Sequence, residues 1–482
     1  MEKGKVQEEN DYSKSGLKAG LEIHQQLDTS KLFCNCSSLL RQDTPSKIIR
    51  RKLNPVVGET GEIDAAVLHE SKKEKEFVYE FYDSCCLVEL DEEPPHAINQ
   101  EALKIALQVA LLLNCKILPA SQIMRKIVID GSNTSGFQRT LLLGYDGFIE
   151  TSEGKVRIGT LALEEDAARI ISQDNKTTIY RLDRLGIPLL EITTEPDLHY
   201  PFQIKEAALK IGEILRSCKV KRGIGTIRQD LNISIKGSER VEIKGFQDPR
   251  MMIETVEKEI ARQKVLVKEK KSIGEVRKAN ADGSTSFLRP MPGAERMYPE
   301  TDLEILEIKR EMINNAKENL PKLRSELQGY LKELGLNEEI INLILEEEKI
   351  EDLKILKEKY DNLNLIGKML TIFPKDISIK KNKSLEEVYE ILNNEILEKI
   401  LREIDKSITE QDVRLVMEKL VEGKSFEEAI KKENIDLERE VQEIIKEKPN
   451  LSINAYMGLL MAKFKGKVSG GEIMQELRRI LG

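Results

Sequence analysis

Charged side chains recur on the polar faces of four segments in which apolar and polar residues alternate. The segments are 19–27, 189–195, 226–237 and 241–246, and this alternation is typical of strands with one buried face. A sheet that packs helices on one face leaves its other face in water, and this alternative explains any single strand. Acids and bases on four such faces favour a shared polar cleft. The side chains expected on these faces are Glu22, His24, Glu191, Glu195, Arg228, Asp230, Glu242 and Lys244.

A cleft of this composition favours a bound cation, because carboxylates that face one another repel unless a cation, Lys or Arg offsets them. Mg²⁺ fits, since it takes oxygen ligands from one or two carboxylates and from substrate phosphates. A lone histidine is more often a hydrogen-bonded structural residue. The spacing of His24 two residues from Glu22 adds weight to the metal-binding alternative. No Walker-type glycine-rich loop is present, so an ATP site would be of another kind.

The stretch 159–197 carries two acidic clusters joined by a turn with Gly186 and Pro188. The second cluster belongs to the predicted strand at 189–195, and its last two acids lie near the strand's end, where a structural role is expected. The clusters are Glu164, Glu165 and Asp166, then Glu191, Glu195 and Asp197.

The six cysteines are too sparse for a disulfide framework, so reduced thiols are expected. A zinc site built from Cys34, Cys36, Cys85 and Cys86 is an alternative use for four of them. We do not expect it, because adjacent cysteines are poor tetrahedral partners and cysteines are common as buried apolar residues.

Composition sets broad limits on the protein. The 482 residues suit about three domains of ~150 residues each. A net charge of −8 excludes a protein that is basic throughout, although a local basic patch suffices to bind nucleic acid. No apolar run is long enough to span a membrane and the charged N-terminus lacks an apolar signal core, so a cytoplasmic protein is expected.

Hydrophobic periodicity predicts a mixed first part and a helical remainder, an α+β fold class. Apolar residues recur at helical spacing in 99–115, 202–218 and 251–271, between the predicted strands. Residues 280–302 are rich in Gly and Pro and predict a loop that closes the first domain. Helical patterns dominate from Glu304, with a composition break at 380–384. The predicted domains are 1–303, 304–383 and 384–482.

Five motifs in this order resemble the B/E subunit family of glutamyl-tRNA(Gln) amidotransferases, and within it the archaeal E-type. The resemblance is close over 16–302 and looser over the helical remainder. The motifs are GLEIHQQLDTSKLFCNC, IDGSNTSGFQRT, LEEDAAR, LDRLGIPLLEITTEPD and RPMPGAERMYPETD.

The resemblance implies a cradle-like catalytic domain with an antiparallel sheet and helices, a helical domain and a C-terminal helical domain that contacts tRNA. It implies an ATP-dependent carbon–nitrogen ligase of the glutamine-hydrolysing glutaminyl-tRNA synthase type. Such an enzyme phosphorylates the γ-carboxylate of mischarged Glu-tRNA(Gln), and ammonia from an asparaginase-like D-type amidotransferase subunit then displaces the phosphate. Implied with it are Mg²⁺ and a heterotetramer of two D and two E chains.

The resemblance also assigns residues. The metal and catalytic site would comprise Glu22, His24, Glu165 and Glu191, with Glu165 chosen over Glu164. The catalytic set would also include Arg228, Asp230, Glu242 and Lys244. Asn232, on the same strand pair, would bind the nucleotide. Arg228 and Lys244 suit phosphate oxygens. Asp130 and Arg139 flank the SNTSG loop and would help to bind ATP or the 3′ end of tRNA. The implied tRNA-binding residues are Lys463, Lys465, Lys467, Arg478 and Arg479.

The chain departs from the family pattern in one place. The E-type usually has an inserted domain, like one in bacterial aspartyl-tRNA synthetases, just before the RPMPG motif, and here only about 264–280 occupy that place. Two alternatives stay open: a bacterial B-type amidotransferase subunit that also acts on Asp-tRNA(Asn), and a tRNA-binding scaffold that has lost catalysis. The retained Glu22, His24, Glu165 and Glu191 weigh against the scaffold.

Overall fold

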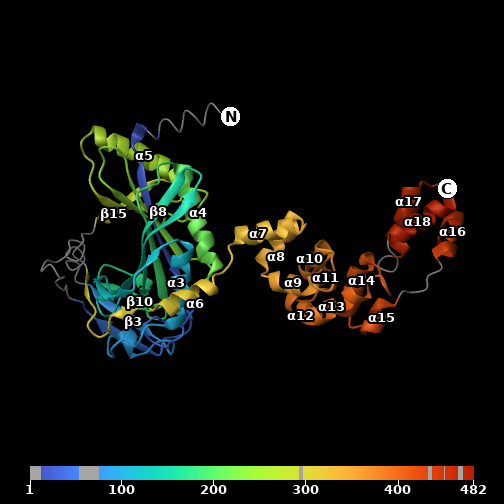
Figure 1. Ribbon diagram of the computed structural model, residues 1–482, viewed down its shortest axis with the longest axis horizontal. Coiled ribbons are helices and arrows are strands. Elements are labelled where there is room, and N and C mark those ends of the chain that lie inside the picture. The colour runs from blue at the N-terminus through green and yellow to red at the C-terminus, as the bar shows by residue number, and fades with distance from the viewer. Residues whose placement is uncertain are drawn as a thin grey trace. The chain divides into compact units, whose positions relative to one another are not determined.

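The structure is a computed structural model that describes residues 12, 14–53, 75–291, 297–431, 437–449, 451–464 and 470–481. The chain forms two compact units, Met1–Leu323 and Arg324–Gly482 (Figure 1). The first combines sheets with helices and the second is helical, so the predicted α+β class is confirmed. Within the described ranges, no helix has the length and apolar character needed to cross a bilayer.

An eleven-stranded sheet dominates the first unit. Its order is β15-β14-β13-β12-β1-β11-β8-β7-β6-β16, with β4 paired to β7. Neighbours are antiparallel except β13 and β14, which run parallel. The strands are β1 (Lys18–Gln26), β4 (Lys116–Ile117), β6 (Met124–Ile127), β7 (Phe137–Thr151), β8 (Gly154–Glu165), β11 (Pro188–Thr194), β12 (Ile227–Ser234), β13 (Val241–Lys244), β14 (Glu275–Ala279), β15 (Thr285–Pro290) and β16 (Met297–Pro299).

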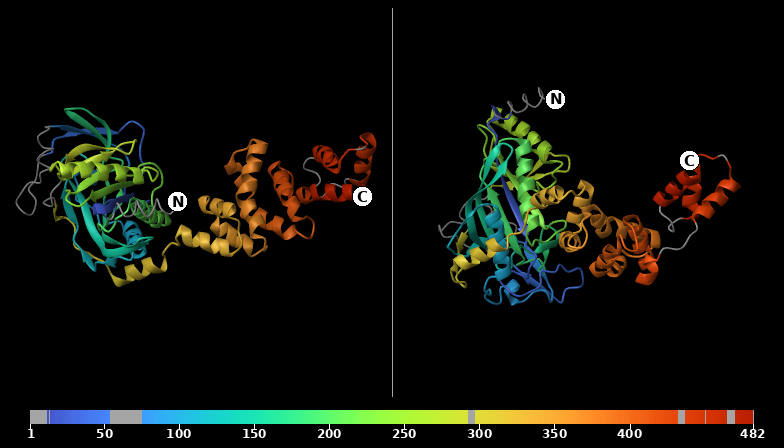
Figure 2. Two further views of the ribbon diagram at one scale, coloured as in Figure 1. Left: turned by 90° about the horizontal axis from the view of Figure 1, so that it is seen from above. Right: turned by 45° about the vertical axis from the view of Figure 1, so that its right-hand side comes forward.

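Helices cover one face of this sheet (Figures 1 and 2). α3 (Gln100–Leu112) packs on β7 and β8, and α4 (Pro201–Ser217) packs on β1 and β7. α5 (Met252–Lys268) lies beside α4, and α6 (Arg310–Glu318) lies against α3. The apolar alternate residues of the strands form one core with these helices; among them are Leu21, Ile23, Leu161, Leu163, Leu190, Ile192, Leu231 and Ile233. The intervening polar residues therefore face the opposite side of the sheet, as the alternation predicts.

Two smaller sheets complete the first unit. Strands β2 (Lys47–Arg51), β3 (Glu76–Phe81), β10 (Thr177–Arg181) and β9 (Arg169–Gln173) form a four-stranded sheet in that order, with its own aromatic core around Tyr79, Tyr82 and Tyr180. β5 (Ala120–Ser121) pairs with β17 (Leu306–Glu307), and a short 3-10 helix, η1 (Leu87–Leu90), follows β3.

The second unit contains two hydrophobic clusters. One joins residues from Leu331 to Ala429, and the other joins residues from Val441 to Leu477. Its helices are α7 (Arg324–Glu333), α8 (Glu338–Glu346), α9 (Ile350–Lys357), α10 (Leu363–Leu370), α11 (Ile372–Lys381), α12 (Leu385–Ile391), α13 (Asn394–Glu403), η2 (Glu410–Asp412), α14 (Val413–Val421), α15 (Phe426–Ile430), α16 (Leu437–Glu447), α17 (Ile453–Lys463) and α18 (Gly470–Leu481).

The division differs from the predicted domains in two places. The first unit extends past residue 303 because Ile308 and Ala316, before and on α6, are buried in its core. The composition break at 380–384 is a tight turn between packed helices: Asn382 adopts a left-handed conformation that ends α11, and the Ser384 side chain caps α12. Helices on both sides of this turn share one hydrophobic cluster.

Candidate functional site

A cavity of about 610 Å³ lies on the polar face of the large sheet. Side chains from β1, β6, β7, β8, β11, β12, β13 and β15 contribute to its lining. The structure thereby brings together most of the polar residues expected in a shared cleft: Glu22, His24, Glu191, Arg228, Asp230, Asn232, Glu242 and Lys244. Glu195 is not among the lining residues.

An acidic group surrounds His24 in this cavity. His24 and Glu191 are directly opposite each other on β1 and β11, and His24 Nε2 lies 3.4 Å from Glu191 Oε2. The same nitrogen lies 3.7 Å from both Glu22 Oε1 and Glu164 Oε1. Lys126 Nζ approaches Glu191 Oε2 at 3.3 Å and Glu164 Oε2 at 3.8 Å. Four acid or imidazole side chains from β1, β8 and β11 and one ammonium from β6 therefore converge.

The electrostatics of this group suit a cation. Burial and the charge of Glu191 raise the pKa of Glu22, and burial raises the pKa of Glu164 to about 7. Burial lowers the pKa of His24. The hydrogen bond to Glu191 and the negative charge of Glu164 outweigh the effect of burial, so the net shift of this pKa is upward. His24 and Lys126 hold the pKa of Glu191 well below its ordinary value against the effect of burial. The protein thus holds partly compensated negative charge that a divalent cation would neutralise.

The donor set fits Mg²⁺. Glu22, His24 and Glu191 each offer a ligand atom, and these atoms lie within 4.8 Å of one another. Glu164 Oε2 is buried and accepts no hydrogen bond from the described residues. Carboxylate oxygens are the ligands that Mg²⁺ prefers, and an otherwise unsatisfied buried oxygen is satisfied by a bound cation.

Glu164, and not the predicted Glu165, belongs to this group. Leu161, Leu163 and Glu165 share the helix-covered face of β8, while Glu164 lies on the cavity face and aligns with Thr140 of β7. Glu165 Oε2 instead accepts from the Arg139 backbone N–H at 3.3 Å and lies 3.4 Å from Arg139 Nη1. The sequence holds the signal for this correction, since the leucine alternation in 161–165 already places Glu165 with the apolar residues.

Carboxylates hold the predicted phosphate-binding cations in place. Arg228 Nη2 donates to Asp166 Oδ1 at 2.9 Å, and the Asp166 side chain is buried. Lys244 Nζ donates to Asp230 Oδ2 at 2.7 Å and lies 2.6 Å from Glu242 Oε1. Burial lowers the pKa of Lys244, but these two carboxylates outweigh it and the net shift is upward. Both side chains are therefore held in place on the cavity wall.

Asp130 and Arg139, predicted to bind ATP or the tRNA end, do not line the cavity. Asp130 is exposed, and its carboxylate accepts from the Ser132 N–H at 2.9 Å within the loop. Arg139 lies on the helix-covered face of β7, where its Nε donates to Glu300 Oε2 at 2.7 Å. Its guanidinium also lies 5.1 Å from the ring centre of Phe137. Arg139 is buried because it shares one face of β7 with the apolar Phe137 and Leu141.

Sequence reasoning missed several residues that line the cavity. Lys126 and Gln138 are opposite each other on β6 and β7, and alternation could have identified both. Asp166 directly follows β8. Arg240 precedes β13, and Arg289 lies on β15, a segment expected to be loop.

Three of the predicted tRNA-binding residues, Lys463, Arg478 and Arg479, lie on the last two helices. Lys463 ends α17 and is exposed, with Nζ 2.7 Å from Glu440 Oε2. Arg478 and Arg479 are exposed on α18, and Arg479 Nη2 lies 2.7 Å from Glu476 Oε1. Lys465 and Lys467 lie outside the described residues.

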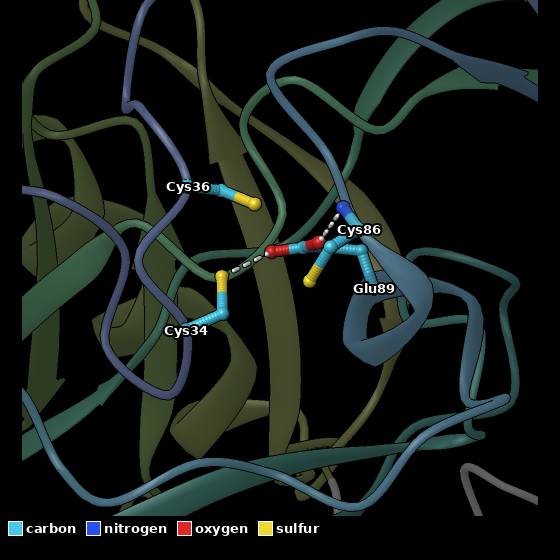
Figure 3. Close-up of side chains that lie close together, drawn as sticks. All are labelled: Cys34, Cys36, Cys86 and Glu89. Atoms are coloured by element: carbon cyan, nitrogen blue, oxygen red, sulfur yellow. Dashed lines mark hydrogen bonds between the residues drawn. The ribbon is translucent and has the colours of Figure 1, made fainter.

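A second group of possible metal ligands lies in the first unit, away from the sheet cavity. Cys34, Cys36, Cys86 and Glu89 each point a ligand atom to a common centre, with these atoms within 4.8 Å of one another (Figure 3). Cys34 Sγ donates to Glu89 Oε1 at 2.9 Å, and the Cys86 N–H donates to Glu89 Oε2 at 2.7 Å. Cys85, predicted with this set, lies instead against the buried Lys31, 3.7 Å from its Nζ.

The objection to zinc from adjacent cysteines does not apply to this arrangement, since only Cys86 of the adjacent pair joins it. Burial and Glu89 raise the pKa of Cys34, and the same causes raise the pKa of Cys86 to about 12. Both are therefore protonated thiols at neutral pH unless a cation binds. The expectation that zinc is absent stays a prediction.

Comparison with known proteins identifies the family. A family model described as the GatB/GatE catalytic domain matches residues 17–314, which span the large sheet, its helices and the cavity. The chain belongs to the GatB/GatE family, whose members are amidotransferase subunits, and the family predicted from the motifs is confirmed.

Among its relatives, the chain is similar to the glutamyl-tRNA(Gln) amidotransferase E subunit of Methanocaldococcus jannaschii, at 37% identity over 98% of this chain and 99% of the relative. The E subunit of Methanococcus maripaludis strain S2 is 35% identical over the same shares. The E subunit of Methanobrevibacter smithii is 47% identical over 68% of this chain and 54% of the relative. The first alignment covers 631 positions although this chain has 482 residues, so many positions of that relative have no counterpart here.

Proposed function

We propose that this chain converts Glu-tRNA(Gln) to Gln-tRNA(Gln) in an ATP-dependent amidotransferase. The observation that carries the proposal is the sheet cavity, where His24 and three carboxylates share a wall with Arg228 and Lys244. A carboxylate and a polyphosphate repel each other, and a site that brings them together must supply both a cation and basic side chains. The relatives, which are named as E subunits of glutamyl-tRNA(Gln) amidotransferase, support the choice of substrate.

The reaction needs two steps, because a carboxylate is a poor electrophile. In the first, a γ-carboxylate oxygen of the glutamyl group attacks the γ-phosphorus of ATP, and ADP leaves. In the second, ammonia attacks the resulting acyl carbon, inorganic phosphate leaves with the bonding electrons, and the nitrogen loses a proton to give the amide. Both steps develop negative charge on phosphoryl oxygens, so electrostatic stabilisation is the main requirement.

The residues of the chain have separate roles in this scheme. Glu22, His24, Glu164 and Glu191 would hold Mg²⁺, which supplies neutralising charge at the transferred phosphoryl group. Arg228 donates to phosphate oxygens from the position that Asp166 fixes. Lys244, between Asp230 and Glu242, provides a second oriented cation.

Ammonia and tRNA would come through partners. We propose that an asparaginase-like D-type amidotransferase subunit supplies ammonia, that two D and two E chains assemble, and that the complex acts in the cytoplasm, where charged tRNA is used. Lys463, Lys465, Lys467, Arg478 and Arg479 would contribute to binding the tRNA backbone.

The test supplies the isolated chain with Glu-tRNA(Gln), ATP, Mg²⁺ and free ammonium, and measures Gln released from the tRNA. Glutamine should form without the amidase partner and should require ATP. The Glu191→Gln variant should be inactive, and Arg250→Gln, at an exposed residue outside the cavity, should match the parent chain. Failure of the parent chain, both alone and with the asparaginase-like partner, would refute the proposed function.

A further inference from the structure

The charges of the cavity are separated along the sheet. One part of the cavity carries four carboxylates, one lysine and one histidine, and it is formed by β1, β6, β8, β11 and the residue after β8. The other part carries four cationic side chains and only two carboxylates, and it is formed by β12, β13, the residue before β13 and β15. The first set is Glu22, His24, Lys126, Glu164, Asp166 and Glu191; the second is Arg228, Asp230, Arg240, Glu242, Lys244 and Arg289. The cavity thus has an acidic part and a basic part.

Two cations of the basic part have no acidic partner among the described residues. Arg228 is paired with Asp166, and Lys244 with two carboxylates. The side chains of Arg240 and Arg289 form no hydrogen bond or ion pair with any residue in the described ranges, although both line the cavity. Arg240 is exposed and Arg289 is half-buried, so both guanidinium groups are accessible to a ligand. Two accessible cations directed at one cavity, with no carboxylate paired to them in the part of the chain that the structure describes, attract an anion there.

Strand register fixes where these arginines lie. Arg289 on β15 is opposite Val276 of β14, which in turn is opposite Glu242 of β13. Glu242 is opposite Asn232 of β12, so Arg289 continues a cross-strand row that already contains two cavity residues. Arg240 enters from the start of β13. The two guanidinium groups therefore reach the cavity from separate strands at the basic part.

We propose that Arg240 and Arg289 bind the polyphosphate chain of the nucleotide, a role that rests on the proposed function. Mg²⁺ held by the acidic part would share phosphate oxygens with these arginines, so the nucleotide would span the two parts of the cavity. Planar guanidinium groups bind phosphate oxygens with two parallel hydrogen bonds, which fixes orientation as well as charge. A phosphate of the tRNA end has the same chemistry, and the experiment separates the two sources.

The experiment measures equilibrium binding by the full chain, with MgATP, magnesium tripolyphosphate and uncharged tRNA(Gln) as separate probes. The variants are Arg240→Gln, Arg289→Gln and the double variant, and the matched control is Arg250→Gln at an exposed arginine. Each single change should weaken MgATP and tripolyphosphate about tenfold, and the double change on the order of a hundredfold, as expected for the loss of charge-assisted hydrogen bonds. Binding of tRNA and of Mn²⁺ should stay within about twofold of the parent chain.

Arg289→Lys serves as a second variant in case Arg289→Gln fails to fold, and it should recover part of the nucleotide affinity because the charge remains. If the parent chain binds MgATP and the double variant binds it equally well, the proposed role of the two arginines is overturned, and the proposed function is not affected. Weakened tRNA binding with unchanged MgATP would assign the site to tRNA phosphate instead. A parent chain that binds neither MgATP nor tripolyphosphate would overturn both this role and the proposed function.

Discussion

Replacing Glu164 and Glu165 separately by Gln should have opposite consequences, although the two residues are adjacent in the chain. Glu164 lies in the cavity beside His24, and Glu165 lies on the other face of the sheet beside Arg139. We expect Glu164→Gln to weaken binding of a divalent cation by about 10–100-fold, the range seen when one supporting group of a metal site is lost. Glu165→Gln should leave cation binding unchanged.

The effect on stability can be worked out for each variant. Mg²⁺ at about 100 times its dissociation constant stabilises the folded state by about 2.7 kcal/mol, and a hundredfold loss of affinity reduces this to about 0.4 kcal/mol. Without cation, Glu164→Gln should cost little, because burial disfavours the charged form of this carboxylate and raises its pKa. Glu165→Gln breaks a buried ion pair, for which about 3–5 kcal/mol is typical. The remaining bond from Arg139 to Glu300 lowers the expected cost to about 2 kcal/mol.

The assay is thermal unfolding of the parent chain and both variants, with and without Mg²⁺ or Mn²⁺. The quantity to compare is the rise in unfolding temperature that the cation causes. Absolute unfolding temperatures are less informative, because a chain with two units can unfold in more than one transition. Loss of the cation-dependent rise in Glu165→Gln, together with its retention in Glu164→Gln, would show that the assignment of the two faces of β8 is incorrect.

Three further variants test other parts of the first unit. Glu191→Gln should abolish phosphoryl transfer and leave tRNA affinity within a few fold, as measured by ADP release and filter binding; equal turnover would remove Glu191 from the cation site. Asp166→Asn should release Arg228 and lower ATP-dependent turnover by about 10–100-fold, and a raised KM for ATP that an Asp166→Glu variant partly restores would distinguish positioning from misfolding. Glu300 is buried between Arg125 and Arg139, which hold its pKa at about 2 against the effect of burial. Because this folded-state pKa is depressed, the stabilisation exists above the ordinary pKa of 4.5 and is lost as pH falls toward about 2. Glu300→Gln should therefore lower unfolding stability at pH 7 and flatten its acid dependence, and identical acid unfolding curves for variant and parent would contradict the pairing.

Alternation of side chains explains which parts of the site could be predicted. β1, β11, β12 and β13 each place apolar residues in the core and charged residues in the cavity, as period-two patterns require. Glu165 was chosen from a family motif, whereas the alternation of Leu161 and Leu163 places Glu164 on the cavity face. Alternation likewise places Arg139 on the face of β7 that carries Phe137 and Leu141, away from the cavity.

Other features depend on contacts that no local pattern contains. Arg289 reaches the cavity because β14 pairs in parallel with β13 and β15 pairs antiparallel with β14, and this part of the chain was expected to be a link and a loop. Asp166 positions Arg228 by accepting a hydrogen bond from it, and this contact joins residues that are distant in the sequence. The Cys34, Cys36, Cys86 and Glu89 group likewise depends on how η1 packs beside the loop after β1.

The connection between α5 and β14 is a place where the catalytic-domain sheet can accept extra chain. Only residues 269–274 join the helix to the strand, and both ends are fixed by the unit itself, α5 by α4 and β14 by its two neighbouring strands. A whole domain can enter or leave between two such fixed ends without shifting the register of the sheet. The length of this connection can therefore change while the residues that line the cavity keep their places.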